Sequence, residues 1–259
     1  MSFNTRIFDY IIKELNPTIG ETIYDPNIAA GDLIVSTINY LNELHENHIV
    51  WERNKHTING CDLSNDLTIV HEKLEAIVKS VDFSDTINCN IINTNNKYDI
   101  VVSHIDFILT STAFSFIINH IMSSIKDNGR CAIIVPANFL VANDNKFIEL
   151  RKEIVDNFNL TKVVAIDFNY SILFFKKSMR IINKPNVNFY DLVDMIEKHD
   201  SILSHDYIQS NRYMIFDDTE LPALIPCESE FKLNLENNKL YQKRMALYDE
   251  SNSKRLKYE

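Results

Sequence analysis

The stretch Glu21-Thr22-Ile23-Tyr24-Asp25-Pro26-Asn27-Ile28-Ala29-Ala30-Gly31-Asp32 reads as a short apolar strand, a turn and the start of a helix. The strand ends at Asp25, and the helix is expected from about 32 to 44, where apolar residues recur at helical spacing. Gly31 is one of only four glycines among 259 residues, whereas average usage of about 7% would give roughly 18. The others, Gly20, Gly60 and Gly129, also lie beside expected strands. A chain that keeps glycine mainly at such turns is typical of a retained α/β fold.

The rest of the chain alternates between strand and helix patterns. Further strands are expected near 57–63, 90–93, 98–103, 131–136, 162–167, 171–176 and 186–190, and further helices near 5–15, 67–81, 111–126 and 146–158. The run Tyr98–Ser103 is almost continuously apolar, as in strands that are buried on both faces. The pattern predicts a doubly wound, mostly parallel sheet with helices on both faces. This α/β domain is expected over 1–192, followed by an extension over 193–259 with an amphipathic helix near 230–247.

Composition limits the classes of function. The net charge is −10, and the basic residues gather only near the end of the chain, so strong autonomous binding of nucleic acid is not expected. No apolar run of 18 residues is present, so we expect no membrane span. The four cysteines are scattered without a Cys-x-x-Cys pair. They predict buried thiols, no metal site and a cytoplasmic or other reducing intracellular location.

Chemically informative residues follow three of the expected strands. Gly31 lies in the turn after the first strand, Asp62 follows the second, and His104-Ile105-Asp106-Phe107 follows the strand that starts at Tyr98. In doubly wound sheets, ligands bind at the carboxyl ends of the strands, where a glycine turn and an acid can hold a nucleoside cofactor. An ordinary turn between strand and helix is the alternative interpretation. His104 and Asp106 could also form an acid–base pair of their own.

Several segments in order resemble the N6-adenine DNA methyltransferases, specifically the modification subunit of type I restriction–modification systems. The resemblance covers about residues 3 to 215 and rests on these stretches: Pro17–Pro26, Asn59-Gly60-Cys61-Asp62, Lys97–Val102 and Asn128–Pro136. It implies a Rossmann-like, S-adenosylmethionine-dependent methyltransferase fold. It also implies that Asp25, Gly31 and Asp62 are cofactor-binding positions and that Phe107 would stack on a flipped adenine.

The same resemblance exposes departures from the family pattern. The family loop Asp-Pro-x-x-Gly-x-Gly-Gly-Phe keeps Asp25, Pro26 and Gly31, but Ala29 and Asp32 replace two glycines. A methyl group at position 29 is expected to crowd the cofactor, and Asp32 adds a negative charge. The catalytic Asn-Pro-Pro-Phe has become His104-Ile105-Asp106-Phe107, and a neutral imidazole offers only one acceptor nitrogen. The family's N-terminal helical region and target-recognition domain are also not recognisable.

These departures predict a catalytically inactive, methyltransferase-like protein that serves as a scaffold or regulatory subunit in a nucleic-acid-processing assembly. We expect a protein partner, contact with nucleic acid through that partner, and a vestigial or lost site for S-adenosylmethionine. The alternatives are an active N6-adenine methyltransferase with a divergent catalytic motif and an acidic mimic of nucleic acid.

Two smaller features have competing interpretations. His45 and His48, with nearby acidic residues, are expected on a solvated helix end rather than at a metal. The single tryptophan, Trp51, either anchors the core or contacts a partner.

Overall fold

A computed structural model describes residues 5–62, 66–88, 96–105, 111–141, 145–166, 170–178, 187–191 and 212–216. The strands are β1 (Ile23–Asp25), β2 (Ile58–Cys61), β3 (Ile87–Asn88), β4 (Tyr98–His104), β5 (Ile125–Pro136), β6 (Phe158–Ala165), β7 (Tyr170–Lys177), β8 (Val187–Asp191) and β9 (Arg212–Phe216). The helices are α1 (Thr5–Leu15), α2 (Asp32–Leu44), α3 (Trp51–Asn54), α4 (Thr68–Ile77), α5 (Ser111–Ser124), α6 (Asn138–Val141) and α7 (Asn145–Asn157), with a 3-10 turn at Lys55–Thr57.

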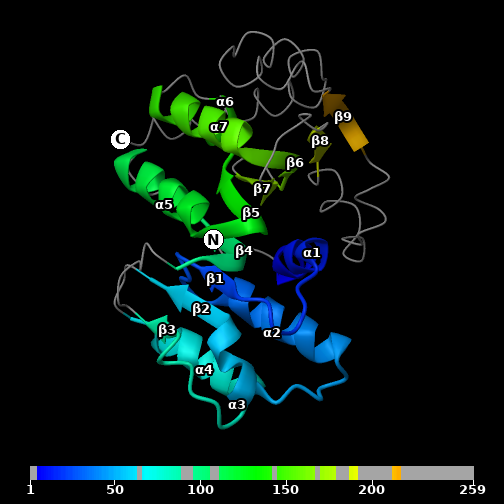
Figure 1. The fold of residues 1–259 in the computed structure, drawn as a ribbon, viewed down its shortest axis with the longest axis vertical. Helices are drawn as coiled ribbons and strands as arrows, with labels where there is room; N and C mark the ends of the chain where they lie inside the picture. Colours follow the sequence, from blue (N-terminus) through cyan, green and yellow to red (C-terminus); the bar gives the residue numbers. More distant parts are fainter. Residues whose placement is uncertain are drawn as a thin grey trace, which may run out of the picture.

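The described strands form one sheet of nine, in the order β3-β2-β1-β4-β5-β7-β6-β8-β9 (Figure 1). The pairs β2–β3, β1–β2, β1–β4 and β4–β5 are parallel, whereas β7 runs antiparallel to both of its neighbours. The predicted doubly wound, mostly parallel α/β fold is therefore confirmed. The carboxyl ends of β1, β2 and β4 lie side by side, which places the three predicted site segments at one edge of the sheet.

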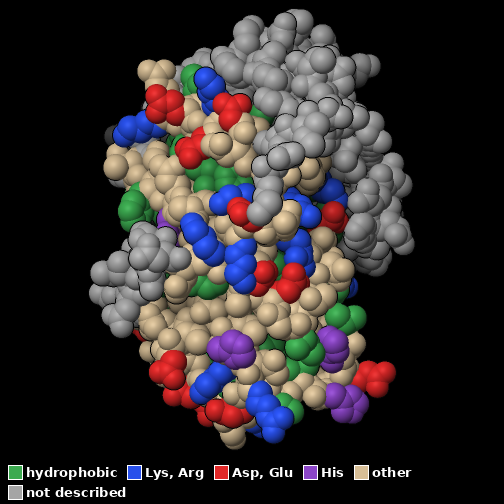
Figure 2. Space-filling view, in the orientation of Figure 1, with side chains coloured by type: hydrophobic (Ala, Val, Ile, Leu, Met, Phe, Trp, Pro, Cys, Tyr) green, Lys and Arg blue, Asp and Glu red, His purple; other side chains and the backbone are tan. Residues whose placement is uncertain are grey.

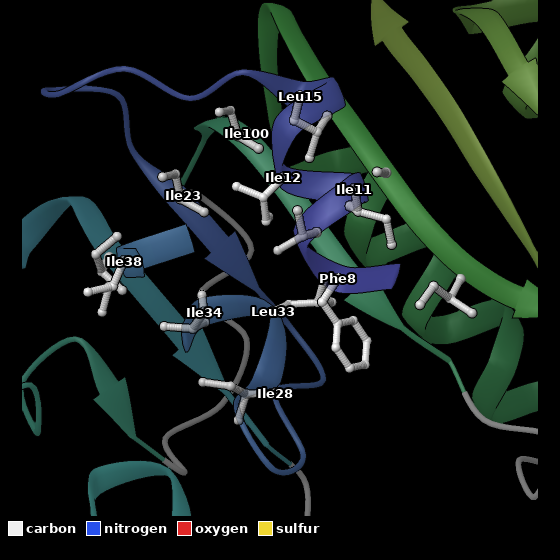
Figure 3. Packing of buried hydrophobic residues seen from close by; sticks show 14 of the residues in the cluster. Phe8, Ile11, Ile12, Leu15, Ile23, Ile28, Leu33, Ile34, Ile38 and Ile100 are labelled. Atoms are coloured by element: carbon white, nitrogen blue, oxygen red, sulfur yellow. The ribbon is translucent and has the colours of Figure 1, made fainter. Parts of the chain in front are cut away.

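Side-chain alternation along the central strands divides the core into two layers. Ile100 and Val102 of β4 face a cluster that contains α1, α2 and α4, whereas Val101 faces a second cluster that contains α5 and α7. Figure 3 shows the first cluster, in which apolar side chains of α1 and α2 meet those of β1 and β4. Each fully buried isoleucine in these layers contributes about 1.5–3 kcal/mol through removal of apolar surface from water.

Charged side chains link α1 and the amino ends of the central strands. Arg130 of β5 donates to both carboxylate oxygens of Glu21, at 2.6 and 2.7 Å, and to the Leu15 and Asn16 carbonyls that end α1. Lys126 and Asp99 form a second ion pair, with a Nζ–Oδ2 distance of 2.7 Å. Figure 2 shows basic and acidic side chains mixed across the middle of the face in view, which accords with the absence of a basic stripe in the sequence.

Several element boundaries differ from the expected ones. β5 begins at Ile125, and its pairing with β4 shifts between Tyr98↔Ile125 and Ile100↔Arg130, so residues 126–129 bulge within the strand instead of preceding it. The expected strand at 90–93 lies outside the described residues, and β3 is found at Ile87–Asn88. The expected helix near 230–247 also lies outside them. β9, which comes after residue 192, pairs with β8 in the same sheet.

Three further expectations can be compared with the structure. No helix among the described residues is long and apolar enough to cross a membrane. Trp51 is 6% exposed and its indole N–H donates to the side-chain oxygen of Asn42 at 2.7 Å, which supports the first of its two interpretations, an anchor of the core. Cys61 and Cys131 are buried and not in disulfides, as predicted, whereas Cys89 and Cys227 lie outside the described residues.

Candidate cofactor and catalytic site

The turn between β1 and α2 keeps the backbone shape that glycine suits. Gly31 has φ +76°, and Ala29 has φ +46°, so both occupy the left-handed region. A Cβ atom at Gly31 would lie 3.0 Å from the Val70 side chain, which gives a second reason for glycine there. An L-residue other than glycine in this conformation costs about 1–2 kcal/mol. Ala29 is exposed and therefore gains little packing in return.

Asp62 hydrogen-bonds this turn. Its Oδ2 accepts from the backbone N–H of Ala29 at 2.7 Å, and the residue is 8% exposed. The preceding residue, Cys61, accepts from the backbone N–H of Ile28 through its carbonyl at 3.0 Å. Ile28 in turn lies over Gly60, where a Cβ atom would come within 2.7 Å of its Cδ1. The end of β2 therefore holds the turn through three consecutive residues.

Asp25 is buried beneath the turn. The side chain is 1% exposed, and its Oδ1 accepts from the backbone N–H of Asn27 at 3.0 Å. Burial raises the pKa of this carboxyl to about 7, the hydrogen bond from Asn27 opposes the rise, and the charge of Asp62 adds to it. At neutral pH the protonated and ionised forms of Asp25 therefore coexist.

The charge of Asp32 is balanced by Lys73 of α4. The Lys73 ammonium lies 2.5 Å from Asp32 Oδ1 and donates to the carbonyl of Ala30 at 2.8 Å. The negative charge that replaces a family glycine is thus paired. The same lysine ties α4 to the turn.

His104, at the end of β4, is held on both sides. Its carbonyl accepts from the side-chain amide of Asn27 at 2.6 Å, and its ring meets Tyr170 edge-on at a centroid distance of 5.5 Å. The ring nitrogen Nε2 is buried. Asp106 and Phe107, the other two predicted catalytic positions, lie outside the described residues.

Three side chains that the sequence analysis did not single out contact the site residues, since Asn27 and Tyr170 contact His104 and Lys73 contacts Asp32. A fourth, His120, contacts Tyr24 within the core. Lys73 and His120 fall within expected helices, and the face on which each lies depends on the helix register. Asn27 and Tyr170 carry no local signal in the sequence, because each contacts His104, which lies 77 residues from Asn27 and 66 residues from Tyr170 along the chain. No group of three His, Cys, Asp or Glu side chains in the described part of the chain could hold a metal ion.

Comparison with known proteins gives one family and one fold. A model of the family described as N-6 DNA Methylase matches residues 48–221, more than half of the chain. No curated protein sequence matches.

The solved structures that match include modification subunits of type I restriction enzymes at low sequence identity. The M protein of the type I restriction enzyme EcoKI superposes with a TM-score of 0.63 at 19% identity, covering 74% of this chain and 48% of that protein. A modification subunit of a putative type I restriction enzyme from Vibrio vulnificus YJ016 gives 0.58 at 14% identity, covering 92% and 53%. The methyltransferase subunit of a type I system from Streptococcus thermophilus gives 0.59 at 16%, covering 81% and 51%. This chain thus spans about half the length of each, and the likeness establishes the fold.

Proposed function

The chain belongs to the N-6 DNA Methylase family, and from that premise we propose that it does not catalyse methyl transfer. Its proposed role is that of a scaffold or regulatory subunit in a nucleic-acid-processing assembly. The three cofactor positions, Asp25, Gly31 and Asp62, are proposed to form a vestigial site for S-adenosylmethionine.

The contact between Asp62 and Ala29 carries this proposal. An acid at the end of the second strand holds a nucleoside cofactor by accepting hydrogen bonds from ribose hydroxyls. Here the carboxylate is more than nine-tenths buried and one of its oxygens already accepts from the Ala29 N–H. Ribose hydroxyls could reach this buried carboxylate only if the turn moved away from it, and breaking the hydrogen bond from Ala29 would cost about 1.5–3 kcal/mol, or about ten- to a hundredfold in affinity. The residues therefore fit the cofactor poorly in this conformation.

The catalytic position gives independent support. Methyl transfer to adenine in the family that this chain resembles uses an asparagine where His104 stands, and the side-chain oxygen of that asparagine accepts a hydrogen bond from the adenine amino group. The Nε2 atom of His104 is buried and its ring packs against Tyr170. A buried ring nitrogen is poorly placed to accept a hydrogen bond from a base that enters from solvent.

The proposed partner is a protein. The structures with similar folds include modification subunits of type I systems, and one of them was described for its complex assembly. A net charge of −10 favours contact with nucleic acid through a partner rather than through this chain alone. We place the assembly in the cytoplasm, where buried free thiols such as Cys61 and Cys131 remain reduced.

The alternative function is an active adenine methyltransferase with a divergent motif. The observation that favours it is the retained turn, since Ala29 and Gly31 both keep the left-handed backbone of a glycine loop. In that case His104 and Phe107 would position the adenine.

A methyl-transfer assay separates the two functions. The protein is incubated with methyl-labelled S-adenosylmethionine and duplex or single-stranded DNA that contains adenine in many sequence contexts, beside the His104→Ala variant. We expect label in adenine no higher than in the protein-free control for both proteins. Label that the wild type incorporates and His104→Ala does not would establish the active alternative.

The scaffold role has a separate test. Native mass spectrometry of the chain isolated from its own cells is expected to find it in a complex heavier than its own 30.1 kDa. A chain found only alone would contradict the proposed role.

A further inference from the structure

Three polar side chains meet inside the core, beneath the turn but apart from its carboxyl-end face. Tyr24 of β1 lies with its Oη 2.9 Å from His120 Nε2 on α5 and 3.2 Å from Cys61 Sγ at the end of β2. Cys61 Sγ in turn donates to the carbonyl of Pro26 at 3.4 Å. Each of the three side chains is more than nine-tenths buried. Tyr24 is further fixed by stacking on Tyr98, at a centroid distance of 4.3 Å.

The hydrogen bonds of this cluster have a defined direction. His120 Nδ1 has no hydrogen-bond partner among the described residues. A buried N–H without an acceptor costs more than an unused lone pair, so the proton of the neutral ring belongs on Nε2. The Nε2–H then donates to Tyr24, the Tyr24 hydroxyl donates to Cys61, and the thiol donates to Pro26. Every member between the two ends accepts one hydrogen bond and donates one, which is the arrangement in which such bonds strengthen one another.

The protonation states suit this order. Burial lowers the pKa of His120, and the positive charge of Lys97 lowers it further, so the ring is neutral near pH 7. Burial also raises the pKa of Tyr24 far above its usual range, which keeps the hydroxyl proton in place.

We propose that His120 is a positioning residue for the turn 25–31, acting through Tyr24 and Cys61. Cys61 meets the turn twice, because its thiol donates to the Pro26 carbonyl and its own carbonyl accepts from the Ile28 N–H. A hydrogen bond that fixes the Cys61 side chain therefore fixes the first half of the turn. α5 begins at Ser111, shortly after Asp106 and Phe107 in the sequence. The chain of hydrogen bonds therefore joins α5 to the turn 25–31. The inference concerns the turn itself and stands whether or not the site binds a cofactor.

The reactivity of the Cys61 thiol reports on this chain of bonds. The full-length protein is treated with N-ethylmaleimide, and mass spectrometry of the peptides gives the alkylation rate of each cysteine. Loss of one hydrogen bond of ordinary strength predicts a rate about fivefold higher for Cys61 in His120→Leu and in Tyr24→Phe. His120→Gln keeps an N–H donor at about the same reach and is expected to restore a rate near that of the wild type.

Two controls isolate the effect. Ser123→Ala removes a hydroxyl that donates to the His120 carbonyl at 2.8 Å and has no hydrogen bond to the His120 ring among the described residues, so the Cys61 rate should not change. Cys131, which is 0% exposed in β5, should stay unreactive in every variant. An equal rise in the alkylation rate of Cys131 would reveal general unfolding of a variant. In that case the proposal is tested by the Cys61 rate in His120→Gln and by the tautomer of His120 in the wild type.

The tautomer of His120 in the wild type provides that second measurement. Nuclear magnetic resonance of the ring nitrogens is expected to show the proton on Nε2 at pH 7. A proton on Nδ1 would overturn the proposed direction, and a Cys61 rate that is the same in His120→Gln as in His120→Leu would overturn the positioning role. Neither result bears on methyl transfer, so this inference and the proposed function can fail separately.

Discussion

Replacing Ala29 by glycine should stabilise the protein, although the same change at the neighbouring Ala30 should destabilise it. Ala29 has φ +46° and is exposed, whereas Ala30 is not among the residues with positive φ. Release of the left-handed strain is worth about 1–2 kcal/mol, and the added freedom of glycine in the unfolded chain costs about 0.5–1 kcal/mol. The net gain for Ala29→Gly is therefore about 0.5–1 kcal/mol, and the loss for Ala30→Gly is about 0.5–1 kcal/mol.

Urea denaturation of the wild type and both variants measures these two changes. The group that donates to Asp62 is the backbone N–H of residue 29, so Ala29→Gly keeps this hydrogen bond and its loss does not contribute to the difference in stability. The two variants are expected to differ by about 1–2 kcal/mol in the free energy of unfolding, with unchanged m-values. If Ala29→Gly were as destabilised as Ala30→Gly, the backbone would not be strained at position 29, and the claim that the turn keeps a conformation suited to glycine there would be refuted.

Three further predictions concern residues around the turn and the opposite edge of the sheet. Because burial raises the pKa of Asp25 to about 7, its protonated form stabilises the fold below pH 4, and up to about 4 kcal/mol of that stability is lost as the pH rises from about 4 to about 7. Urea denaturation at pH 5 and pH 7.5 should show part of this loss in the wild type and not in Asp25→Asn. An equal pH dependence of the two proteins would contradict the raised pKa of Asp25. Arg130→Lys should lower the free energy of unfolding by about 1–3 kcal/mol, since lysine cannot reproduce the paired hydrogen bonds to Glu21. A double-mutant cycle with Glu21→Gln that finds no coupling energy would show that this ion pair does not stabilise the fold. Gly31→Ala should lower the free energy of unfolding by about 2 kcal/mol or more, because position 31 has a φ of +76° and a Cβ atom there would press on Val70. An unchanged midpoint of thermal unfolding would show that neither the backbone strain nor the contact with Val70 matters.

The sequence was a good guide to the fold because its signals were local and repeated. The apolar run Tyr98–Ser103 became a central strand, and the turn that ends at Gly31 became the link to α2. The antiparallel direction of β7 was not predicted, because strand direction depends on pairing across the sheet and leaves no mark on hydrophobic periodicity. Residues 127–130 lay between the expected helix near 111–126 and the expected strand near 131–136, and the structure includes them in β5, because a bulge interrupts the apolar pattern of a strand without ending it.

The candidate site was less predictable, since its contacts join distant segments. Ala29 and Asp32 stood out as departures, but the compensation of Asp32 by Lys73 spans 41 residues and has no local signature. The ring of His104 packs against Tyr170, which begins β7, two strands away from β4 in the sheet and 66 residues along the chain. The left-handed backbone of Ala29 was not predicted either, because the conformation of an exposed alanine leaves no signal in the sequence.

Calorimetric titration of S-adenosylmethionine into the pure protein, with S-adenosylhomocysteine in parallel, tests the central claim most directly. If the turn is closed on Asp62 as described, neither ligand should produce binding heat up to millimolar concentration. Binding at micromolar strength, about −8 kcal/mol, would contradict the account and show that the turn still opens to a cofactor.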